Sequence, residues 1–207
     1  MKLVESFHSL QGEGKNIGLP TYFVRFGGCN LNCRWCDTSY AADRGEKMTV
    51  EEILDLCRPY NRICLTGGEP LLQEGICGLT ESLLEMGKEI TVETNGSMDV
   101  ALLPDDPKVL ISMDIKCPSS GMDDRMDFNN IPKLKPKDQL KFIIFDGKDL
   151  DFAVEVMDRY KPPCESIFSP VGGMDLEPLA EEILYRNLNV RLLPQLHKII
   201  WGRRPGV

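Results

Sequence analysis

The chain has 207 residues, a formal net charge of −8 and a hydrophobic content of 42%. This length suits one well-buried domain that spans residues 1–207. The acidic balance argues against broad nucleic-acid binding, which needs clustered lysine and arginine to replace counterions. No apolar run approaches the roughly 20 residues that cross a bilayer, and the N-terminal segment lacks the apolar stretch of a signal peptide. We therefore expect a cytoplasmic protein whose ligand is a small molecule, without membrane or direct nucleic-acid contacts.

Short β-rich runs alternate with helical patterns along the chain. Strands are predicted over 22–26, 62–66, 90–93, 109–114, 139–145, 166–168 and 190–193. Helices are predicted over 48–57, from after Gly68 to about 86, over about 150–160 and over about 176–186. Such alternation builds a mostly parallel sheet through right-handed crossovers. Six or seven strands are too few for an eight-fold barrel, so we expect an α/β fold of the partial, open (β/α)-barrel type. The polar segment 118–137 is predicted to be a long surface loop able to fold over a site.

Three cysteines lie within eight residues, in the segment GGCNLNCRWCDTSY that begins at Gly27. Iron–sulfur clusters of the [4Fe–4S] type are normally held by four cysteine thiolates. A local set of three (Cys29, Cys33 and Cys36) therefore indicates a cluster with one iron open to a small molecule. Zinc is an alternative, but it favours two ligand pairs, and the other five cysteines are dispersed. Ordinary cysteines without a metal are the second alternative.

Polar residues follow the predicted strands in a recurring way. Ligands bind at the carboxyl ends of parallel strands, and the first of these ends leads into the cysteine segment. The second leads into Thr66-Gly67-Gly68-Glu69-Pro70, the third into Glu93-Thr94-Asn95-Gly96, and later ones into Asp114, Lys116 and Ser169. One interpretation of Gly67 and Gly68 is a simple turn between strand and helix, with no role in binding. Beside a cluster, a backbone without side chains would instead suit the close approach of a cofactor.

Two motifs carry a family resemblance. The spacing C-x3-C-x2-C together with TGGEP resembles the radical S-adenosylmethionine (SAM) superfamily. SLQGEG (9–14) followed by YFVRFGGCNLNCRWCDT (22–38) resembles the 7-carboxy-7-deazaguanine synthases within it. The resemblance continues through VETNGS, SMDIKCPSSG and QLHKIIWG, so it touches most of the chain.

The resemblance implies a reaction and its cofactors. A [4Fe–4S] cluster and SAM would generate a 5′-deoxyadenosyl radical, which takes a hydrogen atom from C6 of 6-carboxy-5,6,7,8-tetrahydropterin. Ring contraction and loss of ammonia would then give 7-carboxy-7-deazaguanine, with Mg²⁺ assisting and SAM regenerated. It also implies an electron-donor protein and a homodimer.

The resemblance implies three sets of site residues. The metal ligands would be Cys29, Cys33 and Cys36 for the cluster and Thr38 for Mg²⁺. The SAM contacts would be Trp35, Cys36, Asp37, Gly68, Glu69, Ser112, Lys116 and Ser169. The substrate contacts would be Leu10, Gln11, Gly12, Glu13, Arg25, Thr66 and Val207.

Arg25 also has a rationale of its own. It lies four residues before Cys29, and a guanidinium can hold a carboxylate through two parallel hydrogen bonds. An ion pair with Glu13 or with another carboxylate of the protein is the alternative.

Two other functions remain as alternatives. An activase of a glycyl radical enzyme would also have a small chain, the three cysteines and a GGE motif, but it would act on a protein and consume SAM. A non-catalytic iron–sulfur or zinc module would need neither Gly67-Gly68-Glu69 nor the recurring polar residues. SLQGEG and Arg25 favour the small carboxylated substrate over both.

Overall fold

The computed structural model describes residues 1–173, 175–202, 204 and 206. Within these residues, nine strands form one sheet in the order β3-β1-β2-β4-β5-β6-β7-β8-β9. The strands are β1 (Lys2–Leu10), β2 (Pro20–Phe26), β3 (Glu46–Lys47), β4 (Arg62–Gly67), β5 (Glu89–Thr94), β6 (Val109–Ile115), β7 (Gln139–Ile144), β8 (Glu165–Pro170) and β9 (Arg191–Leu192). The α-helices are α1 (Val50–Cys57), α2 (Ile76–Glu85), α3 (Gly147–Tyr160), α4 (Glu177–Tyr185) and α5 (Leu196–Trp201). Short 3₁₀ turns are η1 (Ser39–Ala41), η2 (Pro70–Leu72), η3 (Val100–Leu102), η4 (Pro118–Ser120), η5 (Asp123–Arg125) and η6 (Phe128–Lys133).

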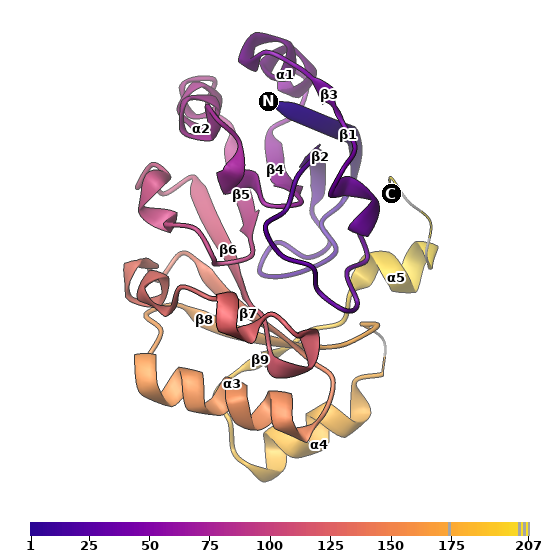
Figure 1. Cartoon of the computed structure of the whole chain (residues 1–207), viewed down its shortest axis with the longest axis vertical. Coiled ribbons are helices and arrows are strands. Elements are labelled where there is room, and N and C mark those ends of the chain that lie inside the picture. The colour runs from indigo at the N-terminus through magenta and orange to yellow at the C-terminus, as the bar shows by residue number, and fades with distance from the viewer. Residues whose placement is uncertain (174, 203, 205, 207) are drawn as a thin grey trace.

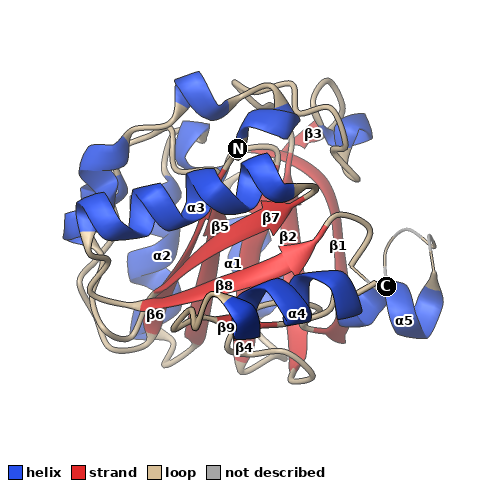
Figure 2. Ribbon diagram, turned by 90° about the horizontal axis from the view of Figure 1, so that it is seen from below, coloured by secondary structure: helices blue, strands red, loops and turns tan. Residues whose placement is uncertain are grey.

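The sheet is a partial, open barrel. Every neighbouring pair from β2 to β9 is parallel, and β1 runs antiparallel to both β2 and β3. The strand order has two free ends, so the sheet does not close on itself. Figure 1 shows α1, α2, α3 and α4 along the outer side of the curved sheet, and Figure 2 shows α3 and α4 packed across it. The predicted fold class is confirmed.

The hydrophobic core lies between the sheet and these outer helices. Alternate strand residues such as Leu65, Val92, Met113 and Phe142 are completely buried on this face. Helix α1 begins at a capping box, in which Thr49 and Glu52 each accept a hydrogen bond from the other's backbone N–H, as their spacing predicts. Burial of the outer face leaves the residues between these apolar positions to line the concave side.

The seven predicted strands correspond to β2 and β4–β9, whereas β1 and β3 were not predicted. Strand β1 is only half-buried along most of its length, so its sequence lacks the regular apolar alternation of a strand that covers a core. Strand β3 has only two residues.

The segment 118–137 differs from the expected surface loop. It forms three 3₁₀ turns and buries Met126, Asn130, Ile131 and Leu134. The polar Asn130 is buried because its side-chain amide donates to the carbonyls of Gly96 and Met98. No helix in the described part of the chain is long and apolar enough to cross a membrane.

Candidate active site

A row of polar side chains crosses the concave face of the sheet. Strand register pairs Arg25 with Thr66, Glu93 with Ser112, and Ser112 with Gln139. Residues paired across parallel strands point to the same face, so these side chains share the concave side. Asp114 and Lys141 form a second pair in the same register, one step further along. The interior of this barrel is therefore polar, unlike the apolar core outside it.

Lys141 is the centre of a buried charge network. Its side chain is 6% exposed, and Nζ lies 2.7 Å from Glu93 Oε2 and 2.9 Å from Glu13 Oε2. Asp114 Oδ1 lies 3.2 Å from the same nitrogen, an ion pair without hydrogen-bond geometry. The other Asp114 oxygen pairs with Lys116 Nζ at 2.8 Å. Two ammonium groups thus compensate three carboxylates from different parts of the chain.

The network shifts the titration of its members in opposite directions. Burial opposes ionisation of Glu13, but the Lys141 charge and the hydrogen bonds from Lys141 and Gln195 together outweigh it and lower the pKa to about 2. For Glu93 burial dominates and raises the pKa, although Lys141 favours the ionised form. Burial also opposes ionisation of Asp114, yet Lys116 and Lys141 bring its pKa below the usual value. Glu13 is therefore a permanent anion at neutral pH, whereas Glu93 is the member most easily protonated.

The QGEG segment closes one side of this interior. Gln11 Nε2 lies 3.4 Å from Glu93 Oε1, and Gln195 Nε2 donates to Glu13 Oε1 at 2.6 Å. A Cβ on Gly12 would lie 2.1 Å from Nδ1 of His197, so only glycine lets the imidazole approach the chain this closely. Burial lowers the pKa of His197, which keeps the ring neutral at pH 7.

The cysteine segment follows β2 at the same end of the sheet. Cys29 and Cys33 are partly buried and Cys36 is exposed, all as free thiols. Burial raises the pKa of Cys33, against the opposing effect of Lys116. Thr38 Oγ1 lies 3.7 Å from Cys36 Sγ. The carboxyl end of β2 thus presents three thiols and a hydroxyl above the charge network.

Glycines bring the cysteine segment against the turn after β4. Gly68 N donates to the carbonyl of Phe26, and Glu69 N donates to that of Gly28 at 2.8 Å. A Cβ on Gly68 would lie 1.9 Å from the Gly28 oxygen and 3.1 Å from Cβ of Cys29. The glycine therefore meets a specific steric requirement beside the first cysteine.

The Glu69 carboxylate is fully buried and bonded within the protein. It accepts hydrogen bonds from the backbone N–H groups of Leu71 and Asn95 and from the hydroxyl of Thr94. Burial raises its pKa against these bonds. Its carboxylate therefore joins the turns after β4 and β5, and Asn95 in turn directs its side-chain amide to Cys29 Sγ at 3.8 Å.

The remaining predicted residues lie around this centre. Trp35 stacks on Phe145 with ring centroids 5.2 Å apart, and Asp37 lies 3.5 Å from the Lys198 ammonium. Ser112 donates to Glu93 Oε2 at 2.7 Å, and Ser169 is buried in β8. The prediction for Val207 falls outside the described residues.

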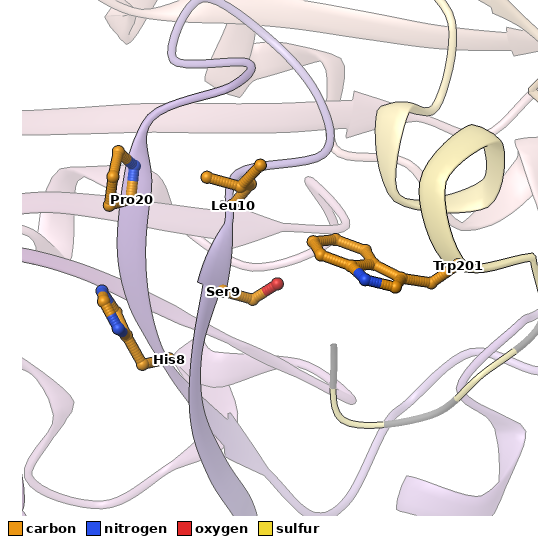
Figure 3. Close-up of a pocket in the computed structure, with 5 residues that line it drawn as sticks. All are labelled: His8, Ser9, Leu10, Pro20 and Trp201. Carbon is orange, nitrogen blue, oxygen red and sulfur yellow. The ribbon is translucent and has the colours of Figure 1, made fainter.

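Leu10 lies apart from the charge network. It lines a pocket of about 320 Å³ together with His8, Ser9, Pro20 and Trp201 (Figure 3). The side chain of Trp201 reaches this pocket from α5, beside the first strand. The pocket has no member of the Lys141 network in its lining.

Several residues of the interior were not predicted as site residues: Glu93, Asp114, Lys141, Gln195 and His197 are among them. Glu93 and Asp114 stood among the polar residues at strand ends, whereas Lys141 stands within the otherwise apolar QLKFII of β7. A charged residue in a strand covered on both faces is itself a signal of a partnered interior site.

The three free thiols of the cysteine segment are the groups that would hold a [4Fe–4S] cluster, with one thiolate at each of three irons. Among the described residues, no three Cys, His, Asp or Glu side chains are grouped so as to hold one ion. A four-iron cluster instead takes one thiolate at each of several irons, so its ligands need not converge on one point. The close glycine turn and the buried Asn95 amide beside Cys29 complete a cradle for such a group.

Comparisons with known proteins agree with this geometry. The family model of the radical SAM superfamily matches residues 23–132. The chain is 40% identical over its full length to a 7-carboxy-7-deazaguanine synthase of Thermoplasma acidophilum, also matched over its full length. It is 41% identical to that of Methanospirillum hungatei, with 97% of this chain and 85% of the relative covered. The crystal structure of QueE from Escherichia coli has the same fold, with a TM-score of 0.77, 23% identity, and 95% and 94% of the two chains covered. The chain belongs to the 7-carboxy-7-deazaguanine synthase family of radical SAM enzymes.

Proposed function

We propose that this enzyme converts 6-carboxy-5,6,7,8-tetrahydropterin to 7-carboxy-7-deazaguanine with loss of ammonia. The observation that carries the proposal is the pairing of two kinds of group on one concave face. Arg25 supplies a guanidinium for a ligand carboxylate, and Glu13 and Glu93 supply acceptors for ligand N–H groups. A carboxylated pterin carries both complementary groups, the carboxylate on C6 and the N–H donors of its pyrimidine ring.

The cysteine segment would hold the cofactors. Cys29, Cys33 and Cys36 would bind a [4Fe–4S] cluster, which with SAM supplies a radical able to take the hydrogen atom from C6 of the pterin. Gly68 would admit SAM close to the backbone because no side chain occupies that position. Trp35, Asp37, Gly68, Glu69, Ser112, Lys116 and Ser169 are the proposed SAM-site residues, with Glu69 acting through the turn that its buried carboxylate fixes.

The chain's own groups would fix the pterin during the rearrangement. Lys141 holds Glu13 ionised, so this carboxylate accepts hydrogen bonds from the ligand. The neutral His197 and the Gln11 amide lie beside the same space and complete the polar contacts. Because Glu93 is the most readily protonated carboxylate, it is the proposed group to accept the proton that the ring loses and to pass it to the departing amine, which then leaves as ammonia.

Further partners belong to this proposal. Thr38 would contribute a hydroxyl to Mg²⁺, a hard cation that prefers oxygen ligands and keeps waters or substrate oxygens in its shell. The remaining proposed substrate contacts are Leu10, Gly12, Thr66 and Val207. A homodimer, an electron-donor protein and a cytoplasmic location complete the proposal, without direct nucleic-acid binding.

The decisive experiment is anaerobic incubation of the reconstituted protein with SAM, reductant and the carboxylated tetrahydropterin. We expect a deazapurine product while SAM is conserved. Consumption of SAM without that product would contradict the proposal and favour the activase.

Arg25→Ala tests the substrate contact separately. We expect it to weaken pterin binding far more than SAM binding, because Arg25 is placed for the carboxylate. Arg62→Ala is the matched control, since Arg62 pairs with Glu89 at the opposite end of β4. Equal loss of pterin and SAM affinity in Arg25→Ala would contradict this role.

A further inference from the structure

The side chain of Glu5 joins the substrate arginine to the cysteine segment. Glu5 on β1 lies opposite Arg25 on β2, just beyond a register shift in the pairing of the two strands. Its Oε1 accepts a hydrogen bond from Arg25 Nε at 2.8 Å and another from the Tyr40 hydroxyl at 2.8 Å. One carboxylate oxygen thus contacts both the arginine and a residue that follows the third cysteine.

The contact leaves the far end of the guanidinium available. Arg25 has five N–H donors, and Glu5 occupies the one on Nε. Among the described residues, neither Nη nitrogen of Arg25 donates to a protein acceptor. The guanidinium also lies over Phe7, with Cζ 5.7 Å from the ring centroid, and Phe7 stacks on Phe23. Held on one edge and one face, the side chain directs its two Nη groups as a fork for a ligand carboxylate.

The second contact fixes the arginine relative to the cofactor segment. Tyr40 lies in η1, two residues beyond Thr38, and the neighbouring Ala41 carbonyl accepts a hydrogen bond from Gly28 N. Glu5 therefore spans from β2 to the backbone that brackets the three cysteines.

We propose that Glu5 is a positioning residue, which orients Arg25 toward the ligand carboxylate and, through Tyr40, sets the distance between that carboxylate and the cysteine segment. The inference rests on the proposed function, because it assigns Arg25 to the carboxylate of a pterin. The alternative is that Glu5 only stabilises the edge of the sheet. The two roles differ in which ligand is affected, since a structural loss would weaken every ligand.

The test compares two pterins that differ only in the carboxylate. We would measure anaerobic binding of 6-carboxytetrahydropterin and of the same tetrahydropterin without its carboxylate to the reconstituted protein. Glu5→Gln should weaken the carboxylated ligand about tenfold, the effect of one charge-assisted hydrogen bond. It should leave the other pterin, SAM affinity and iron content unchanged, and raise KM more than it lowers kcat. In an Arg25→Ala background Glu5→Gln should add nothing, since the arginine that it orients is absent.

Two further variants keep the outcome decisive. Tyr40→Phe removes one hydrogen bond without changing a charge, and it should reduce the preference for the carboxylated pterin less than Glu5→Gln does. Glu89→Gln, in the partner of Arg62 at the other end of the sheet, is the matched control and should change neither ligand. Equal weakening of both pterins, or loss of iron, in both Glu5→Gln and Tyr40→Phe would overturn the positioning role.

Failure of the inference and failure of the proposed function give different results. If the wild-type enzyme forms the deazapurine but Glu5→Gln keeps the full preference for the carboxylate, the inference alone is wrong. If the wild type forms no product, and Glu5→Gln still abolishes the preference for the carboxylated pterin that the wild type shows, the proposed reaction is wrong and the positioning role stands. A wild type that binds neither pterin would overturn both.

Discussion

Replacing Lys141 by methionine removes the cation at the centre of the site. The lysine is 6% exposed, and its nitrogen lies within 3.2 Å of carboxylate oxygens of Glu93, Glu13 and Asp114. Methionine fills a similar volume but supplies no charge and no donor. The variant would leave three carboxylates facing one another, with only the Lys116–Asp114 pair to compensate them.

Two separate estimates give the same magnitude for the decrease in the free energy of unfolding. Removing one partner of a buried ion pair costs about 3–5 kcal/mol, because the other charge is left without compensation. Independently, the pKa of Glu13 falls from its ordinary 4.5 to about 2 although burial opposes ionisation, chiefly through Lys141. At 1.36 kcal/mol per pKa unit, that change corresponds to about 3 kcal/mol. We therefore expect Lys141→Met to lower the free energy of unfolding by about 3–5 kcal/mol at pH 8.

The decrease in unfolding free energy caused by Lys141→Met should become larger as the pH rises. In the wild type the pKa of Glu13 is lower in the folded than in the unfolded chain, so this stabilisation is present above about pH 4.5 and is lost as the pH falls toward 2. Without Lys141, burial raises the pKa of the carboxylates, and the folded variant takes up protons at higher pH than the unfolded chain. The difference between wild type and variant should therefore be larger at pH 8 than at pH 5.

Urea unfolding of the metal-free wild type and variants, prepared under identical anaerobic conditions, measures this difference at both pH values. Lys161→Met is the matched control, because its pair with Asp158 is about three-quarters exposed on both sides and exposed pairs contribute about 0–1 kcal/mol. Lys141→Arg retains the cation and should show a smaller loss than methionine. A loss below about 1 kcal/mol for Lys141→Met at pH 8, or one that is the same at pH 5, would refute the reasoning.

Three further predictions concern the cysteine segment. Any single alanine replacement of the three loop cysteines should lose the cluster, measured as iron and sulfide per chain after anaerobic reconstitution; a triple variant that kept about four of each would contradict the assignment. Gly68→Ala should destabilise the protein by about 1–3 kcal/mol and lower iron content, because the new Cβ would lie 1.9 Å from the Gly28 oxygen. Gly78→Ala, in a helix with open space around it, should instead stabilise the protein by about 0.5–1 kcal/mol, and urea unfolding measures both glycine variants. Thr38→Ala should blunt the stimulation of turnover by Mg²⁺, and an unchanged Mg²⁺ response would remove Thr38 as a ligand.

The parallel part of the fold could be predicted because its outer face follows simple rules. Strands β4–β7 are buried on both sides and read as short apolar runs between turn residues, which is the pattern that distinguishes them from helices. The first strand could not be found in this way. Its inward residues include Glu5, which is charged yet partnered by Arg25 across the strand pair. That partnership depends on tertiary structure, so local sequence alone gave no signal for it.

Site residues could be recognised where residue type and local spacing indicate one chemistry. They were harder to recognise where the role depends on contacts with residues far away in the sequence. The cysteine spacing and Gly68 were recognisable from sequence, and the structure brings Gly68 directly against the first cysteine turn. The ion pair expected for Arg25 as an alternative does form, but with Glu5 rather than Glu13. Glu13 is instead bound to Lys141, a residue 128 positions away. No sequence pattern relates positions so far apart; the loop between β1 and β2, which carries Glu13, reaches Lys141 on β7 only in the folded chain.

The openness of the barrel explains why so many charges can be buried in it. A closed eight-stranded barrel fills its interior with packed side chains, whereas this sheet leaves its concave side to be lined by polar groups. Among the described residues around that side, Arg25, Lys116 and Lys141 face the carboxylates of Glu5, Glu13, Glu93 and Asp114. The set is nearly balanced, so an anionic substrate gains little from overall attraction. Its recognition must instead depend on where donors remain available, and the Nη groups of Arg25, held in place by Glu5, provide such donors next to the cysteine segment.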